Sequence, residues 1–373
     1  MKTALSRRHF LQTTAAASLG LAALGRSRAR AASPNGKLRV LSIGVVGTIG
    51  SLDRKQVAGH PEVEIAGLCD VDSNYLAQAA AEHPQAFTCR DYREAFAKHG
   101  DKFDAVIVSV PDHSHAPILL TAMAHHKHVY GQKPLVHQLE ELVMVERALK
   151  ARPQLVTQLG NQRMANIFSY DELMSPVSVK TDCAEPAGKH FHVNPCKSTV
   201  VYQVGSDKFS GKTFPIHYSD SGQQATAAQL RIPEPVTDSS MTAVVCEGGT
   251  MVLAPEGGMK IWRDGKATAG LRLPGLPAFP PLNHWHAWVD NCLGKKTELR
   301  TPFKDAVRIT EATLLAVKAT RFPGQELRWD KSKLAFTNHP EAPIPLSVAN
   351  TATDLPRHPW HDHDSPIINN YAN

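Results

Sequence analysis

Residues 104–134 constrain the fold of this 373-residue chain more than any other stretch. They open with a short β-branched run, 104–110, that lacks helical spacing and ends at a proline, so we expect a buried strand. Apolar residues then recur at helical spacing over 118–123, and an extended run follows at 128–130. Two buried strands joined by one helix form a parallel, right-handed unit. In such sheets, ligands bind beyond the carboxyl ends of the strands.

The carboxyl ends of these two strands, residues 110–115 and 131–133, should therefore face a cofactor. The first reads V-P-D-H-S-H, the second runs into Q-K-P-L, and a further strand and loop (LVTQLGNQ) follow at 155–162. In these motifs the chain resembles the Gfo/Idh/MocA family of nicotinamide-dependent oxidoreductases, over most of residues 38–162. The family's tetrad usually begins with Glu, whereas this chain has Gln132.

A dinucleotide fingerprint follows the alternating, β-rich run at residues 38–43. The fingerprint needs G-x-G-x-x-G between a strand and a helix, because the glycines let the backbone approach a pyrophosphate at the helix N-terminus. Gly47 and Gly50 fit the second and third places, but Val45 occupies the first. Gly44 stands one position early, which predicts a wider turn. Alone, this motif would be a weak signal.

The next strand supports the fingerprint. Residues 63–68 are apolar and β-rich, and they lead to Asp70, 20 residues beyond Gly50. An acid at that distance accepts hydrogen bonds from the adenosine ribose and repels a 2′-phosphate, so we expect NAD rather than NADP. The alternative is that Asp70 caps the following helix, but Asp72 is the better cap for a helix over 75–81.

The resemblance implies that three strand-end loops line the nicotinamide side of the site. We therefore predict the following cofactor contacts: Gly44, Gly47, Thr48, Ile49, Asp70, Val110, Pro111, Asp112, His115, Gln132, Lys133 and Asn161. His113 and His115 could instead be loop histidines bonded to the backbone, and for His113 we favour that interpretation.

Lys133 is the candidate catalytic residue. Removing hydride from a secondary alcohol requires a group that manages the hydroxyl proton. A lysine beside bound nucleotide and Pro134 can be desolvated, and in the family this lysine is the usual acid/base or substrate anchor. A lone lysine is more often a solvated surface charge, but its place at a strand end favours the functional interpretation. His286, in a helix opening at residue 283, is the second catalytic candidate, or equally a histidine packed at a helix N-terminus.

The second half of the chain predicts an antiparallel sheet. Short β-rich runs lie at 178–181, 198–203, 213–218, 241–246 and 250–253, and helical spacing marks 306–319. The fold class is therefore α/β: a Rossmann-type doubly wound parallel sheet (38–162), then a second α+β domain with an open, mainly antiparallel sheet (163–345), and a C-terminal arm (346–373). Only residues 163–176 stand where the family carries a glycine-rich segment with Asp and His, which predicts impaired catalysis as an alternative.

The amino terminus predicts export. S-R-R-H-F-L-Q at residues 6–12 matches a twin-arginine signal, and a 12-residue apolar run and small residues at 29–31 follow. We expect residues 1–31 to be a signal peptide, which places the mature protein in the periplasm or outside; a non-cleaved amphipathic terminus is the alternative. The run is too short to span a bilayer. Residues 1–31 carry six basic side chains and no acid, which accounts for the whole net charge of +6. Charge therefore gives no case for nucleic-acid or membrane binding after cleavage.

Cysteine and histidine spacing predicts no metal site. The six cysteines are dispersed and include no C-x-x-C pair. Cys183 and Cys196 could pair in an oxidising compartment, although two free thiols are favoured. We interpret the histidines at 125, 126 and 128 as structural, those at 190 and 192 as strand neighbours, and the His-rich 358–364 as part of a surface arm.

Three functions remain open at this point. The first is an exported NAD-dependent oxidoreductase acting on a sugar or sugar-like secondary alcohol, either as a net dehydrogenase or as a glycosidase that uses transient oxidation. The second is a nucleotide-binding protein that has lost catalysis. The third and weakest is a histidine-rich metal binder. The resemblance also implies a homo-oligomer.

Overall fold

The computed structural model of the chain describes residues 36–161, 173–183, 196–204, 213–219, 225–233, 242–253, 259–268 and 283–339. The predicted signal (1–31), most of the 163–176 interval, His190 and His192, and the arm (346–373) lie outside these ranges. Within the described ranges, no helix has both the length and the apolar character needed to cross a bilayer.

The first domain is built on six parallel strands in the order β3-β2-β1-β4-β5-β6. They are β1 (Leu38–Ile43), β2 (Val63–Cys69), β3 (Phe87–Cys89), β4 (Ala105–Val108), β5 (His128–Gln132) and β6 (Thr157–Gly160). From β1 the chain adds β2 and β3 on one side, and it then adds β4, β5 and β6 on the other side. Such folds bind their ligands where the strand order reverses in this way, here between β1 and β4. This confirms the doubly wound parallel sheet. Three-residue β3 was not predicted, because so short a run carries no periodic signal.

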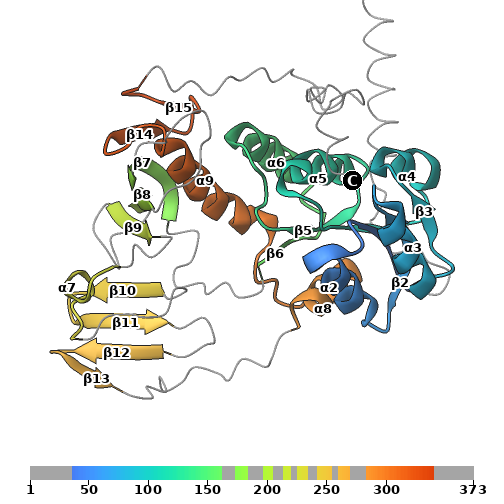
Figure 1. The fold of residues 1–373 in the computed structure, drawn as a ribbon, viewed down its shortest axis with the longest axis horizontal. Coiled ribbons are helices and arrows are strands. Elements are labelled where there is room, and N and C mark those ends of the chain that lie inside the picture. Colours follow the sequence, from blue (N-terminus) through green and yellow to red (C-terminus); the bar gives the residue numbers. More distant parts are fainter. Residues whose placement is uncertain are drawn as a thin grey trace, which may run out of the picture.

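Helices cover both faces of this sheet (Figure 1). One face packs on α2 (Gly47–Ala58), α3 (Ser73–Glu82) and α8 (His284–Cys292), and the other on α4 (Tyr92–His99), α5 (His115–Ala124) and α6 (Leu139–Ala151). Both faces are therefore apolar, and β4 is buried along its whole length. A short 3-10 turn, Asp112–Ser114, joins β4 to α5.

The second half is antiparallel, as predicted, but its strands form two sheets where the sequence suggested one. A five-stranded sheet has the order β15-β14-β7-β8-β9 and a four-stranded sheet the order β10-β11-β12-β13. Their strands are β7 (Leu173–Cys183), β8 (Cys196–Val204), β9 (Thr213–Ser219), β10 (Thr242–Cys246), β11 (Gly249–Leu253), β12 (Met259–Arg263), β13 (Lys266–Thr268), β14 (Glu326–Asp330) and β15 (Ala335–Phe336). The short helix α7 (Ala227–Leu230) packs on the four-stranded sheet.

Helix α9 (Phe303–Ala319) joins the two halves (Figure 1). Its first turns pack in the core beneath the parallel sheet, and its last turns, with Leu315 and Ala319, pack against Val179 and Leu327 of the five-stranded sheet. Helix α8 also belongs to the first domain, because its fully buried Trp288 packs beside β1 and β4. The Rossmann core therefore includes α8 and the start of α9, both from the part of the chain after residue 163 that the sequence suggested was a separate domain.

Candidate dinucleotide site

Two glycines shape the turn between β1 and α2. Gly44 has φ +79°, and a Cβ there would lie 2.2 Å from the carbonyl oxygen of Ser109, so the β1 and β4 strand ends touch backbone to backbone. Gly47 has φ +73°, yet no other described atom comes within 4 Å of the position its Cβ would take. Gly44 thus closes the turn against the sheet, whereas Gly47 leaves an open face at the start of the helix.

The N-terminus of α2 suits an anion. Val46 precedes the helix, and among the described residues no side chain of the cap or first turn offers an oxygen to the first amides. Thr48 is exposed and Ile49 is partly exposed. Unpaired helix amides and the helix dipole attract phosphate, and the open face at Gly47 gives a pyrophosphate room to approach. The turn therefore fits a dinucleotide.

Asp70 lies against this turn, as the spacing predicted. Its Oδ2 accepts a hydrogen bond from the Val45 amide at 2.9 Å, and its Oδ1 accepts one from the Asp72 amide at 3.0 Å. The cap of α3 is Asp72, which accepts from the amides of Asn74 and Tyr75. Asp70 is thus not the helix cap, and its half-exposed carboxylate joins the β1 and β2 strand ends where a ribose would lie.

The loop after β4 carries Val110, Pro111 and Asp112, which are partly or fully exposed, and then the buried His115. The His115 ring nitrogens lie 2.5 Å from the Pro134 carbonyl oxygen and 2.9 Å from that of Val110. His115 therefore ties the β4 and β5 strand ends together through their backbones. This is the backbone-bonded arrangement that the sequence also allowed. It holds the two loops that border the site in place.

Gln132, Lys133 and Asn161 complete the edge of the sheet. Gln132 is buried, whereas the Lys133 side chain is exposed, so Pro134 alone does not desolvate it. The Lys133 amide donates to Gln132 Oε1 at 3.2 Å. Asn161 follows β6, and its carbonyl accepts from the Thr301 hydroxyl at 3.2 Å. Together with the glycine turn, Asp70 and the loop after β4, these residues come from five neighbouring strand ends.

A family model described as "Oxidoreductase family, NAD-binding Rossmann fold" (GFO_IDH_MocA) matches residues 38–158, which hold the fingerprint, Asp70 and the Q-K-P loop. The chain's Rossmann domain belongs to the Gfo/Idh/MocA oxidoreductase family. This confirms the resemblance drawn from V-P-D-H-S-H and Q-K-P-L, and it makes the domain an NAD-binding one.

Curated relatives of this chain match only in part. A "Glycosyl hydrolase family 109 protein" from Solibacter usitatus is 31% identical over 185 residues, which is 45% of this chain and 41% of the relative. An "Inositol 2-dehydrogenase" from Salmonella paratyphi B is 26% identical over 159 residues, 40% of this chain and 45% of the relative. The chain thus spans less than half the length of these relatives.

Among solved structures, the WlbA dehydrogenase from Bordetella pertussis, in complex with NADH and UDP-GlcNAcA, superposes with a TM-score of 0.53 at 14% identity. The match covers 79% of this chain and 99% of that one. At this identity the likeness shows a shared fold, and it extends beyond the Rossmann domain.

Sequence reasoning missed a buried carboxylate beneath the site of this Gfo/Idh/MocA domain. Asp53 of α2 is fully buried, and its carboxylate accepts from Ser109 Oγ at 2.7 Å, Gln132 Nε2 at 2.8 Å and Trp285 Nε1 at 2.8 Å. Tyr130 donates a further side-chain hydrogen bond. Burial raises the pKa of Asp53, and these donors oppose the rise. We call these five residues the Asp53 cluster.

A sequence signal for Asp53 did exist. Gly50, Asp53, Arg54 and Val57 are all buried and recur at helical spacing on α2. Asp53 and Arg54 are charged residues on the buried face of this helix, so each needs hydrogen-bonding or ionic partners. Arg54 finds them in the Val45 carbonyl and the Glu82 carboxylate, at 3.2 and 3.1 Å, so it braces the glycine turn from behind.

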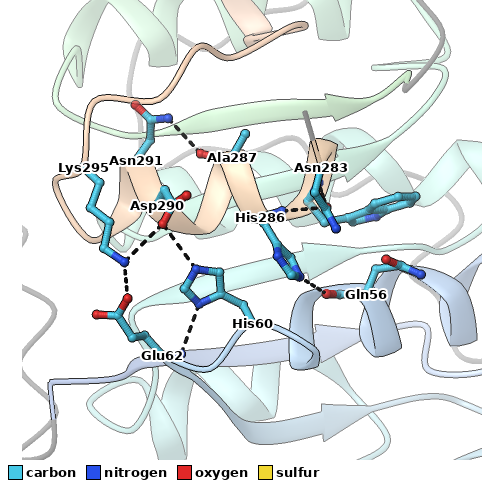
Figure 2. Close-up of polar contacts among 10 residues, drawn as sticks. Gln56, His60, Glu62, Asn283, His286, Ala287, Asp290, Asn291 and Lys295 are labelled. Atoms are coloured by element: carbon cyan, nitrogen blue, oxygen red, sulfur yellow. Dashed lines mark hydrogen bonds and ion pairs between the residues drawn. The ribbon is translucent and has the colours of Figure 1, made fainter. Parts of the chain in front are cut away.

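His286 lies in the contact between α2 and α8 (Figure 2). Its amide donates to the Asn283 cap, its Nε2 lies 3.1 Å from the Gln56 carbonyl oxygen, and its ring meets the His60 ring edge-on at 5.1 Å. These contacts are those of the histidine packed at a helix N-terminus, the alternative to a catalytic role for His286.

Beside His286, three potential metal ligands converge: His60, Glu62 and Asp290 (Figure 2). The ammonium group of Lys295 already pairs with both carboxylates, and His60 Nε2 lies 3.2 Å from Asp290 Oδ1. A cationic side chain therefore occupies the place that a metal ion would need. The group acts as an ion-pair network that fastens α8 to the start of β2.

Two other histidines are buried in this Gfo/Idh/MocA domain. His128 accepts a hydrogen bond from the Val156 amide at 2.9 Å, and His284 Nε2 lies 3.0 Å from the Leu159 carbonyl oxygen. Burial lowers the pKa of each to about 4, so both rings are neutral at pH 7. For His128, this agrees with the structural interpretation.

Proposed function

We propose that this chain is an NAD-dependent oxidoreductase that moves hydride between nicotinamide and a secondary alcohol of a sugar or sugar-like molecule. The observation that carries the proposal is the position of Lys133. It extends, exposed, from the carboxyl end of β5, on the same sheet edge as the glycine turn and Asp70. A dinucleotide bound at that turn would run along the edge toward Lys133.

Each part of the edge has a separate task in this proposal. The α2 N-terminus at Gly47, Thr48 and Ile49 would hold the pyrophosphate through backbone amides. Asp70 would accept from the adenosine ribose, which favours NAD over NADP. Bound NAD would supply the hydride acceptor. Lys133 would hold the substrate hydroxyl and take or return its proton, and the exposure of its side chain leaves it accessible to a substrate.

The relatives support a sugar-like substrate. Among them are an inositol dehydrogenase and glycosyl hydrolases of family 109, at similarly low identity. The second resemblance favours a redox-neutral glycosidase mode, in which an alcohol is oxidised only transiently to allow elimination. A nucleotide-binding protein without catalysis remains the alternative from another class, based on the short 163–176 interval. Export by the twin-arginine route and a homo-oligomeric state are part of the proposal.

The test combines mass spectrometry of the purified full-length protein with assays on sugar alcohols, inositols and aryl glycosides. We expect NAD to bind, and absorbance of the reduced nicotinamide to rise with a net-dehydrogenase substrate. Release of the aryl group without net reduction would indicate the glycosidase mode. Lys133→Met should abolish either reaction while NAD still binds.

The matched control is Lys102→Met, which removes an exposed lysine from the loop ahead of β4. Because that loop lies at the amino end of the strand, the change should leave activity unaltered. NAD binding with no turnover on any of these compounds would favour the non-catalytic alternative. Failure to bind either NAD or NADP would refute the proposal.

A further inference from the structure

The Asp53 cluster joins four elements and includes Gln132, the residue directly before Lys133. Asp53 comes from α2, Ser109 from the end of β4, Tyr130 and Gln132 from β5, and Trp285 from α8. Asp53 and Ser109 are 0% and 8% exposed and Gln132 is 3% exposed, so water competes little for these hydrogen bonds. The cluster therefore fixes the β4 and β5 strand ends relative to the helix that carries the phosphate-binding turn.

Gln132 connects this cluster to Lys133. Its amide nitrogen donates to Asp53 and its amide oxygen accepts from the Lys133 backbone N–H. Both ends of the amide are thus used, which sets its orientation. From the other side, His115 holds the carbonyl of Pro134. The Lys133 backbone is therefore restrained at the residue before it and at the residue after it.

The neighbouring strand leaves room for this arrangement. A Cβ on Gly160 of β6 would lie 2.5 Å from Gln132 Nε2 and 2.6 Å from its Cδ. Distances this short are not tolerated between such atoms, so the Gln132 amide occupies space that any larger residue at 160 would need. The packing around Gln132 is as close as that of a protein core.

Charge explains why glutamine stands at position 132 in this chain. A glutamate there would put a second carboxylate oxygen about 2.8 Å from Asp53 Oδ2, the place of the present amide nitrogen. Two buried carboxylates in contact cannot both be ionised. Glutamine instead supplies a donor to Asp53 and keeps an acceptor for Lys133, whereas a glutamate could bond to Asp53 only if one of the two carboxyl groups held a proton.

We propose that Asp53 and Gln132 are a matched pair that sets the position of Lys133, which makes Asp53 a positioning residue of the hydride-transfer site. The proposal rests on the proposed role of Lys133 in proton transfer. It deepens that role by naming the buried group that holds the lysine in place, through Gln132, while Asp53 itself touches neither substrate nor cofactor.

The test is a reversal of the hydrogen bond in the full-length protein. Gln132→Glu alone brings two carboxylates together, and Asp53→Asn alone turns an amide N–H₂ toward groups that now donate to Asp53. In the double variant Asp53→Asn/Gln132→Glu, the new asparagine donates to the new glutamate, which still accepts from the Lys133 amide. Hydrogen exchange of the 131–135 backbone, measured by mass spectrometry without ligand, reports the local restraint.

In each single variant the hydrogen bond between residue 132 and residue 53 is lost, so we expect the Lys133 amide to exchange about tenfold faster. In the double variant that bond is restored, and we expect exchange to return toward the native rate. With a substrate in hand, the single variants should lower kcat more than they raise KM. Single variants with native exchange, or a double variant that adds the two defects, would overturn the pairing.

Glu311→Gln provides the matched control. Glu311 is also a buried carboxylate bonded to an indole, with Trp329 Nε1 at 3.0 Å, but it lies on α9 against the five-stranded sheet. This variant should lose stability without altering exchange at Lys133. If it accelerates exchange there equally, Asp53 acts only through global stability and the proposal is wrong. Absent turnover in every protein, wild type included, would count against the proposed function alone.

Discussion

The two left-handed glycines at the first turn should fail in different ways when changed to alanine. Gly44 and Gly47 have nearly the same φ, +79° and +73°, so an added methyl strains both backbones alike. The surroundings differ, because the new Cβ at Gly44 would lie 2.2 Å from the Ser109 carbonyl oxygen, whereas at Gly47 no described atom lies within 4 Å. The pair therefore separates crowding from conformational strain.

The magnitudes follow from these two terms. An L-residue in the left-handed region costs about 1–2 kcal/mol, which applies to both variants. Forcing a methyl into a filled space adds about 1–3 kcal/mol, which applies to Gly44→Ala alone. We therefore expect a loss of about 2–5 kcal/mol of unfolding free energy for Gly44→Ala and about 1–2 kcal/mol for Gly47→Ala. The gain from a stiffer unfolded chain is common to both and cancels in the comparison.

Ligand binding should show the opposite order. At Gly47 the methyl would occupy the open face where the backbone meets a pyrophosphate, so NAD affinity should fall by more than about tenfold. Urea unfolding followed by tryptophan fluorescence gives the first comparison, and titration with NAD at a temperature where both variants are folded gives the second. Equal destabilisation by the two changes, or native NAD affinity in Gly47→Ala, would refute this account of the turn.

Three further outcomes are expected. Asp70→Ala should weaken NAD binding and reduce discrimination against NADP, and titration with both dinucleotides checks this; an unchanged ratio contradicts the ribose contact. The lowered pKa values of His128 and His284, about 4 against an ordinary 6.5, mean that the unfolded chain binds more protons between these pH values. The unfolding free energy therefore holds its full value above pH 6.5 and falls by about 3 kcal/mol for each ring as pH falls through 4. His284→Gln should reduce this dependence of the unfolding free energy on pH, measured by urea unfolding between pH 6.5 and 4. Lys331→Met should cost about 1–3 kcal/mol in urea unfolding, because Lys331 Nζ donates at 2.9 Å to the buried Glu311. An unfolding midpoint equal to that of the wild type would count against a contribution from this ion pair.

Local sequence signals determined much of this protein. The β-branched runs, the fingerprint glycines and the spacing to Asp70 predicted the parallel sheet and its ligand edge. Asp72 was correctly expected to cap the helix now bounded as Ser73–Glu82. These features depend on neighbours a few positions away, through periodicity, capping and backbone conformation, so a single sequence contains them.

The tertiary structure decided what brings distant residues together. Trp285 donates to Asp53, 232 positions away in the sequence, and its helix α8, although it lies in the second half of the chain, packs in the Rossmann core. The ring nitrogens of His115 lie within hydrogen-bond distance of backbone carbonyl oxygens, and His286 packs against α2. No periodicity encodes such contacts. They follow from a buried charge or ring taking whichever partners the folded chain places within hydrogen-bond distance, and burial makes those partners necessary.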